Sequence, residues 1–119
     1  MAHPVVWFEV LGKDASNLQQ FYGQLFGWKF DTSSPIRYGT VEAQGAKDIP
    51  GGVGQVFEGA RSWVTFYVRS QDLPGSLAQA EQLGGKVVMH PRQIPGGPNI
   101  AFFSDPEGHV IGLVEEMPS

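Results

Sequence analysis

The sequence contains no cysteine, few charged residues and no long apolar run. The absence of cysteine from the 119 residues excludes disulfides, thiolate metal ligands and cysteine nucleophiles. No stretch of about 18 apolar residues occurs, and no basic segment precedes an apolar one, so we expect neither a membrane span nor an export signal. These absences favour a cytoplasmic protein without a membrane partner.

The charge is low and slightly negative. Only 17% of the residues are charged, the formal net charge is -4, and the 8 Lys and Arg residues form no basic stripe. A nucleic-acid partner is therefore not expected. The hydrophobic fraction of 41% is typical of a globular chain, and the length predicts one domain over 1–119.

The chain repeats a strand, helix and strand pattern. A strand pattern contains Trp7 and recurs with Trp63, which is 56 residues later. Each pattern is followed by a helical run that ends in glycine, at Gly27 and at Gly84. A duplicated unit at this spacing predicts two modules, at about 1–58 and 62–119. The weak linker between them is 59–62.

Helical spacing is clearest in the first module. Its apolar residues recur at i, i+3, i+4, i+7 and i+8, which predicts that they pack into the core: Leu18, Phe21, Tyr22, Leu25 and Phe26. Either Asp14 or Ser16 caps the start of this helix, and Gly27 suits its end. The second helix is expected at about 73–83, with Asp72 as its cap.

Strand patterns complete both modules. We expect strands at 5–11, 28–32, 37–43 and 52–57, and again at 62–69, 86–90, 99–104 and 109–115. The order is βαβββ twice, which is an α+β fold, and Asp105-Pro106-Glu107-Gly108 predicts a type I turn before the last strand. Alternation along the strands turns Phe8 and Val64 toward the helices and Trp7, Glu9 and Trp63 to the opposite face.

Several of these segments together resemble the vicinal oxygen chelate superfamily of glyoxalase I, bleomycin-resistance proteins and extradiol dioxygenases. The resemblance rests on Phe21-Tyr22, Leu25-Phe26-Gly27-Trp28, Gly84-Gly85-Lys86-Val87 and Asp105-Pro106-Glu107-Gly108-His109-Val110-Ile111-Gly112-Leu113-Val114. It implies that each module forms a curved mixed sheet and that two modules pair to enclose a cavity. It also implies a homodimer.

The metal-dependent members hold a divalent ion through His and Glu residues on the first and last strands of the modules. The resemblance places Trp7, Trp63 and Gly112 at three of these positions, and a small or apolar residue, or Gln55, at the fourth. Neither an indole nor a glycine supplies a side-chain ligand. We therefore expect no metal site and no cofactor, with a divalent ion bound elsewhere as the alternative.

The same positions predict an aromatic lining for the cavity. Trp7, Trp63 and Tyr67 would bring aromatic faces, Glu9 and Thr65 would be polar points, and Gly112 would leave a gap at the backbone. Such a lining suits a flat or partly aromatic small organic molecule. The glycine-rich segments at 51–52 and 96–97 are expected to be flexible loops at the rim.

Three functions stay open on this sequence. The first is metal-independent binding of a small molecule, as in drug-sequestering relatives. The second is a glyoxalase-type lyase or isomerase that uses a divalent metal or Glu9 as a base. The alternative for Glu9 is a salt bridge near the end of the sheet or across a dimer interface. The third is a structural or regulatory protein with a vestigial cavity. His3, His90 and His109 have no supporting carboxylate pattern and are read as surface residues.

Overall fold

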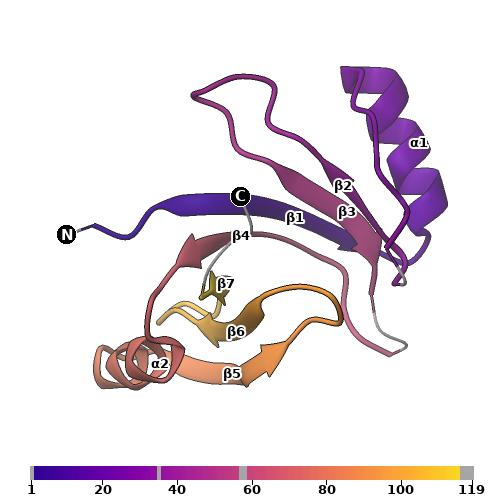
Figure 1. Ribbon diagram of the computed structural model, residues 1–119. Helices are drawn as coiled ribbons and strands as arrows, with labels where there is room; N and C mark the ends of the chain where they lie inside the picture. Colours follow the sequence, from indigo (N-terminus) through magenta and orange to yellow (C-terminus); the bar gives the residue numbers. More distant parts are fainter. Residues whose placement is uncertain (1, 35, 57–58, 116–119) are drawn as a thin grey trace. The chain divides into compact units, whose positions relative to one another are not determined.

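A computed structural model describes residues 2–34, 36–56 and 59–115. These residues form seven strands and two helices, so the predicted α+β class is confirmed (Figure 1). The chain divides into two compact units, the N-terminal unit Trp7–Val64 and the C-terminal unit formed by Met1–Val6 and Thr65–Ser119.

The N-terminal unit contains a three-stranded sheet and one helix. Along the chain follow β1 (Val5–Gly12), α1 (Ala15–Phe26), β2 (Tyr38–Val41) and β3 (Gly51–Gln55). β3 lies between β2 and β1, antiparallel to β2 and parallel to β1. Figure 1 shows α1 beside β2 and β3. One strand, β3, thus separates β2 from β1.

The ends of α1 follow local rules. The carboxylate of Asp14 accepts a hydrogen bond from the backbone N–H of Asn17, so Asp14 is the cap and Ser16 is not. Gly27 ends the helix with φ of 73°, in the left-handed region that favours glycine. The amide of Gln55 fixes the preceding corner, because its oxygen accepts from the N–H of Ala15 and its nitrogen donates to the carbonyl of Lys13.

The predicted strand at 28–32 is wrong. Only Asp31 pairs with Thr40, through two backbone hydrogen bonds of 2.9 and 3.0 Å, and the ladder goes no further. Trp28 instead packs into an aromatic cluster, with ring centroids 5.1 Å from Phe26 and 5.8 Å from Tyr22. Side-chain packing therefore takes the place of strand pairing after α1.

The predicted core face of α1 is only partly correct. Leu18 and Tyr22 are half-buried, but Phe21, Leu25 and Phe26 are 56%, 58% and 55% exposed. A polar residue occupies part of the face toward the sheet, since Gln19 donates from Nε2 to the carbonyl of Val53 at 2.8 Å. The apolar stripe of the helix is therefore wider than the surface that its own unit covers.

Val64 does not pack against a helix as alternation predicted, because it is 76% exposed. The glycines at 51–52 are not a flexible rim either. Both are buried at the start of β3, with Gly51 opposite Phe8 and Gly52 opposite Glu9 in the parallel ladder. The predicted end of this strand at Phe57 lies outside the described residues.

The C-terminal unit contains a four-stranded sheet and one helix. Its elements are β4 (Trp63–Arg69), α2 (Leu73–Gln82), β5 (Lys86–Gln93), β6 (Asn99–Ser104) and β7 (Val110–Val114). The strand order is β4, β7, β6, β5, with β4 and β7 parallel and the other pairs antiparallel. The segment at 96–97 is the turn between β5 and β6.

The core of this unit lies between α2 and the sheet. Leu73, Leu77, Ala101 and Leu113 are each 5% exposed or less, and partly buried residues of β4, β5 and β6 pack around them. Asp72 caps α2 as predicted by accepting from the N–H of Gly75 at 3.0 Å. The helix therefore begins where its buried leucines can face the strands.

The predicted turn before the last strand is present. The N–H of Gly108 donates to the carbonyl of Asp105 at 2.9 Å, and Gly108 has φ of 94°. The carboxylate of Asp105 also accepts from the backbone N–H groups of Glu107 and His109. Among the described residues, neither helix is long and apolar enough to cross a bilayer.

Candidate functional site

Alternation along β1 separates two kinds of side chain. Phe8 points to the helix side, where its ring centroid lies 5.3 Å from that of Trp28. Trp7 and Glu9 lie on the opposite face, as predicted from the period of two. The side chain of Glu9 is nearly inaccessible, with 4% exposure for the residue, although carboxylates are seldom buried without partners.

The buried carboxylate of Glu9 joins three aromatic side chains. Its Oε1 accepts from the phenol of Tyr38 at 3.0 Å, and its Oε2 accepts from Nε1 of Trp63 at 2.9 Å. The Nε1 of Trp7 donates to the same phenol oxygen at 2.8 Å. The structure thus links Trp7 to Tyr38, and both Tyr38 and Trp63 to Glu9. These four residues are called the Glu9 network.

Sequence reasoning missed Tyr38. It stands on β2, and its register partner on β3 is Gly54, whereas Glu9 stands on β1 opposite Gly52. Burial, and then the charge of Glu9, raise the pKa of Tyr38 far above its ordinary value. The phenol therefore stays protonated and acts as a hydrogen-bond donor. The sequence signal that could have pointed to Tyr38 is the pair of alternate glycines, Gly52 and Gly54, in the strand after it.

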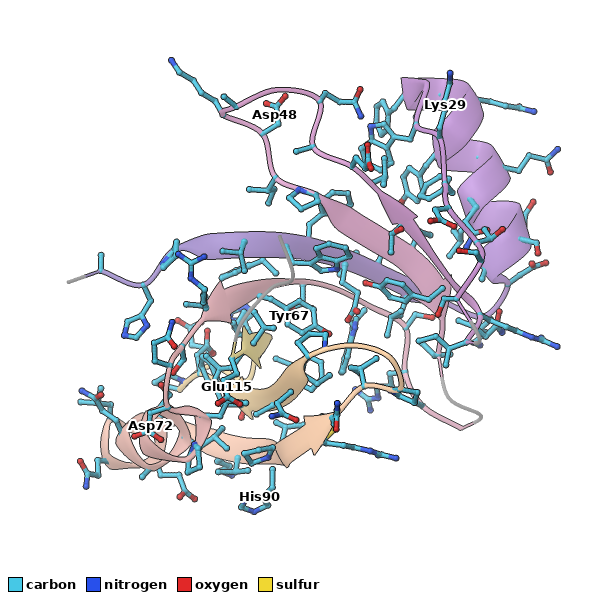
Figure 2. All side chains as sticks on the ribbon, in the orientation of Figure 1. Lys29, Asp48, Tyr67, Asp72, His90 and Glu115 are labelled. Atoms are coloured by element: carbon cyan, nitrogen blue, oxygen red, sulfur yellow. The ribbon has the colours of Figure 1, made fainter. Side chains whose placement is uncertain are left out.

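The other predicted lining residues lie in the C-terminal unit. Thr65 and Tyr67 are both 6% exposed, and the hydroxyl of Thr65 donates to the carbonyl of Val110 at 2.7 Å. Tyr67 pairs with Gly112, and a Cβ on Gly112 would overlap the Tyr67 ring. That ring fills the space which the sequence left for a ligand at Gly112. Figure 2 shows Tyr67 among the strands of this unit.

The tyrosine also contacts a second aromatic ring. The centroids of Tyr67 and Phe102 lie 5.5 Å apart at an interplanar angle of 62°, which is an edge arrangement. Thr65, Tyr67 and Phe102 are all buried. Their arrangement accounts for packing within the unit, and their contact with a ligand stays a prediction.

The positions that the resemblance assigns to metal ligands do not fit a metal. The indole nitrogens of Trp7 and Trp63 carry hydrogens, and both donate to the Glu9 network. Gln55 uses its amide on the backbone of Lys13 and Ala15. Within residues 2–34, 36–56 and 59–115, no three His, Asp or Glu side chains gather as a potential metal site.

The histidines occupy surface positions, as expected. Nδ1 of His3 lies 2.9 Å from the carbonyl of Arg69, and His90 points away from the strands in Figure 2. Nδ1 of His109 lies 2.9 Å from the Asp105 carboxylate, in an exposed pair within the turn. Hydrogen bonds from the backbone and ring of His109 lower the pKa of Asp105 below its ordinary value.

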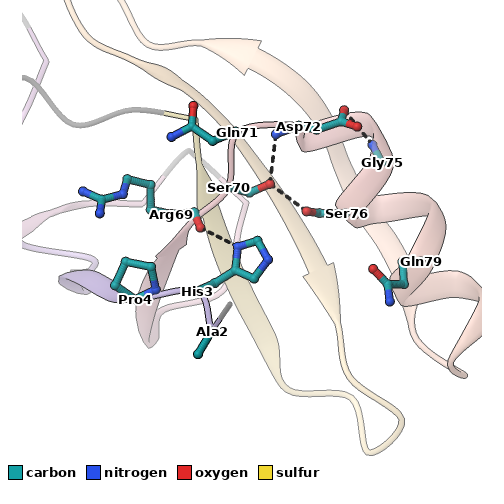
Figure 3. Close-up of a pocket in the computed structure, with 10 residues that line it drawn as sticks. All are labelled: Ala2, His3, Pro4, Arg69, Ser70, Gln71, Asp72, Gly75, Ser76 and Gln79. Atoms are coloured by element: carbon teal, nitrogen blue, oxygen red, sulfur yellow. Dashed lines mark hydrogen bonds between the residues drawn. The ribbon is translucent and has the colours of Figure 1, made fainter.

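Two surface grooves are lined by residues other than the predicted site residues. One, of about 470 Å³, runs along the start of α2 in the C-terminal unit (Figure 3). Its residues mostly bond one another, for example Ser70 Oγ with Ser76 Oγ at 2.7 Å. The other, of about 550 Å³, lies along α1 beside Phe21 and Tyr22. Neither groove is lined by a member of the Glu9 network.

Similarity to curated proteins covers most of the chain. A glyoxylase-like domain-containing protein of Didymella fabae is 28% identical over 115 residues, which is 88% of this chain and 88% of the relative. The anthracycline biosynthesis protein DnrV of Streptomyces peucetius is 28% identical over 90% of this chain. The match covers only 45% of DnrV.

Solved structures share the fold at low sequence identity. Methylmalonyl-CoA epimerase of Mycobacterium tuberculosis matches with a TM-score of 0.67 at 16% identity, covering 96% of this chain and 88% of that one. The Streptomyces coelicolor enzyme gives 0.69 at 15% identity, with 100% and 99% covered. The family model described as glyoxalase-like domain matches residues 7–114. The chain therefore belongs to the glyoxalase-like domain family, within the vicinal oxygen chelate superfamily.

Proposed function

We propose that the protein binds a flat, partly aromatic organic molecule against Trp7 and Trp63, with Glu9 fixing the geometry of the site. The observation that carries this proposal is the Glu9 network. Both indole N–H groups donate into it, directly at 2.9 Å from Trp63 and through Tyr38 from Trp7, while both tryptophans remain partly exposed. Because hydrogen bonds already fix the two indole rings, a ligand that packs against them loses little affinity to the ordering of these side chains.

Binding without a metal is part of the proposal. An indole N–H is only a donor, and glycine has no side chain, so Trp7, Trp63 and Gly112 cannot replace the family's His and Glu ligands. No step of the proposed function therefore passes through a metal ion. Metal analysis of the purified protein tests this, and a stoichiometric divalent ion would contradict it.

The name of one relative motivates a polycyclic ligand. The Streptomyces peucetius relative is named for anthracycline biosynthesis, and anthracyclines contain fused aromatic rings. A drug-sequestering role like that of bleomycin-resistance proteins belongs to the same class of function. We therefore propose fused-ring natural products as the first ligands to test, together with bleomycin.

A lyase or isomerase reaction with Glu9 as base is the second candidate. The buried carboxylate of Glu9 and the fold shared with methylmalonyl-CoA epimerase favour it. However, both carboxylate oxygens already accept hydrogen bonds, from Tyr38 and from Trp63, and a substrate proton would have to compete with these bonds. Solvent deuterium exchange into a bound carbonyl compound, lost in Glu9→Gln, would support this candidate over simple binding.

The binding proposal is tested by thermal shift with a panel of anthraquinones, naphthoquinones and flavonoids. A ligand at 100 times its Kd adds about 2.7 kcal/mol to the unfolding free energy of the native protein. We expect Trp7→Leu and Trp63→Leu to lose the shift, and the control Trp28→Leu to keep it, since Trp28 packs under α1. No shift with any compound would favour the structural or regulatory alternative.

We also propose that the protein is a homodimer and that α1 contributes to the interface. The helix contains no charged residue, so two copies can face each other without like-charge repulsion. The exposed parts of Phe21, Leu25 and Phe26 offer roughly 300 Å² of apolar surface per copy. Two such faces approach the apolar share of a small standard interface.

Light scattering after size-exclusion chromatography tests the dimer. We expect the double variant Phe21→Gln, Leu25→Gln to be monomeric, because both side chains are already more than half exposed and their loss should not unfold the monomer. Leu83→Gln is the matched control, since Leu83 is 72% exposed at the C-terminal end of α2. A monomeric wild type would contradict the proposal.

We keep a cytoplasmic location as a proposal, motivated by the absence of an apolar run of about 18 residues from the sequence. Fractionation of the source cells, with a probe for the natural protein, would test it. Recovery of the protein outside the cytoplasm would overturn it.

A further inference from the structure

One face of β3 carries no side chain where Tyr38 crosses it. Gly52 and Gly54 alternate with Val53, so both glycines point to the same side of the strand. A Cβ on Gly52 would overlap Cε2, Cζ and Oη of Tyr38, and a Cβ on Gly54 would meet Cδ1 at 2.5 Å. The ring therefore lies directly on the two glycines.

This position lets a side chain of β2 reach a side chain of β1. β3 separates the two strands, yet the phenol oxygen of Tyr38 is 3.0 Å from Oε1 of Glu9. An alanine or larger residue at 52 would occupy the space through which the ring passes. The hydrogen bond between Tyr38 and Glu9 therefore requires glycine at position 52, and Gly54 gives the ring further room.

The direction of each hydrogen bond follows from the chemistry of the donors. An indole N–H can only donate, so the phenol oxygen of Tyr38 accepts from Trp7 and its own O–H donates to Glu9. The phenol consequently holds two groups at once, the indole of Trp7 at 2.8 Å and the carboxylate of Glu9 at 3.0 Å. Trp63 reaches the other carboxylate oxygen independently.

We infer that Tyr38, seated on Gly52 and Gly54, is the positioning residue of the Glu9 site and sets the orientation of Trp7 relative to Trp63. This inference rests on the proposed ligand site. Tyr38 acts through its neighbours, because its hydroxyl is occupied by Trp7 and Glu9. Removing the hydroxyl should release Trp7 while the Trp63 bond to Glu9 remains.

Tyr38→Phe is the direct test, because it keeps the ring on the glycines and removes only the hydroxyl. We expect the indole N–H of Trp7, followed by nitrogen-edited NMR, to exchange with solvent roughly tenfold faster, as the loss of one hydrogen bond implies. The Trp63 signal should change less. Tyr22→Phe is the matched control in the same unit and should leave the Trp7 indole unchanged.

A ligand from the fused-ring panel separates the two proposals. Reduced affinity in Tyr38→Phe together with faster Trp7 exchange supports both the site and the positioning role. Faster Trp7 exchange without ligand binding by any form of the protein supports the positioning of Trp7 and overturns the ligand site. Unchanged exchange of Trp7 overturns the positioning role, whatever the ligands do.

The packing of the Tyr38 ring on Gly52 can be tested separately. Gly52→Ala should destabilise the wild type and have a smaller effect in a Tyr38→Ala background, where the ring is absent. Gly51→Ala is the control on the opposite face, because a Cβ there would overlap Phe8. Its effect should not depend on Tyr38. If Gly52→Ala and Tyr38→Ala changed the free energy of unfolding additively, the packing of the Tyr38 ring on Gly52 would be contradicted.

Discussion

The indole N–H of Trp63 donates to Oε2 of Glu9 at 2.9 Å, across 54 residues of sequence. Glu9→Gln would place an amide NH₂ where a carboxylate oxygen now accepts from Trp63 or from Tyr38. We expect a loss of about 1–3 kcal/mol in the free energy of unfolding, measured with urea. Glu42→Gln is the control, because Glu42 is exposed, and an equal loss in both variants would contradict the role of the network.

The buried phenol of Tyr38 should make the stability of the protein sensitive to alkaline pH. The pKa of Tyr38 is raised in the folded protein, whereas an unfolded tyrosine ionises near pH 10. Unfolding then releases a proton, so the stability contribution is complete below about pH 10 and decreases as the pH rises further. Tyr38→Phe should lose less stability than the wild type between pH 9 and about pH 11 in urea melts. Parallel curves would contradict this.

The turn before β7 should weaken in acid. The pKa of Asp105 is lowered in the folded state by hydrogen bonds from His109, so its carboxylate stabilises the turn above the unfolded value of 3.8. That contribution is lost as the pH falls below about 4 and through the folded pKa. The stability difference between the wild type and Asp105→Asn should therefore shrink from pH 6 to about pH 2. A constant difference would exclude the carboxylate charge as its cause.

Substitution by alanine should destabilise the protein far more at Leu77 than at Leu83, two leucines of the C-terminal unit. Leu77 is 3% exposed in the core under α2, and Leu83 is 72% exposed at its end. Leu77→Ala should cost about 2–5 kcal/mol of unfolding free energy because it leaves a cavity. Leu83→Ala should change it by about 0.5 kcal/mol or less. Similar costs in denaturant melts would show that the exposed leucine is covered in solution.

Features governed by neighbouring residues could be predicted from the sequence. The caps at Asp14 and Asp72, the left-handed Gly27 and the turn that ends at Gly108 each depend on a few consecutive residues. The alternation of Phe8 against Glu9 followed from the strand period. The confirmed fold class rests on these local signals and on the duplication.

Features governed by strand register could not be predicted. Tyr38 meets Glu9 only because β3 is parallel to β1 and antiparallel to β2 with particular pairings. The face of α1 was misjudged because Gln19, a polar residue, bonds the carbonyl of Val53 in place of an apolar contact. The ligand cavity and the identity of its ligand stay predictions, since the pattern of residues along the chain does not specify which molecule binds.

The glycines of β3 also constrain how related sequences can diverge. A ring of β1 occupies the space beside Gly51, and a ring of β2 occupies the space beside Gly52 and Gly54. A single mutation that adds a side chain to this strand meets a ring already in place. In an alignment of relatives, we therefore expect position 52 to covary with position 38, and position 51 with position 8, so that a larger residue in one accompanies a smaller residue in the other.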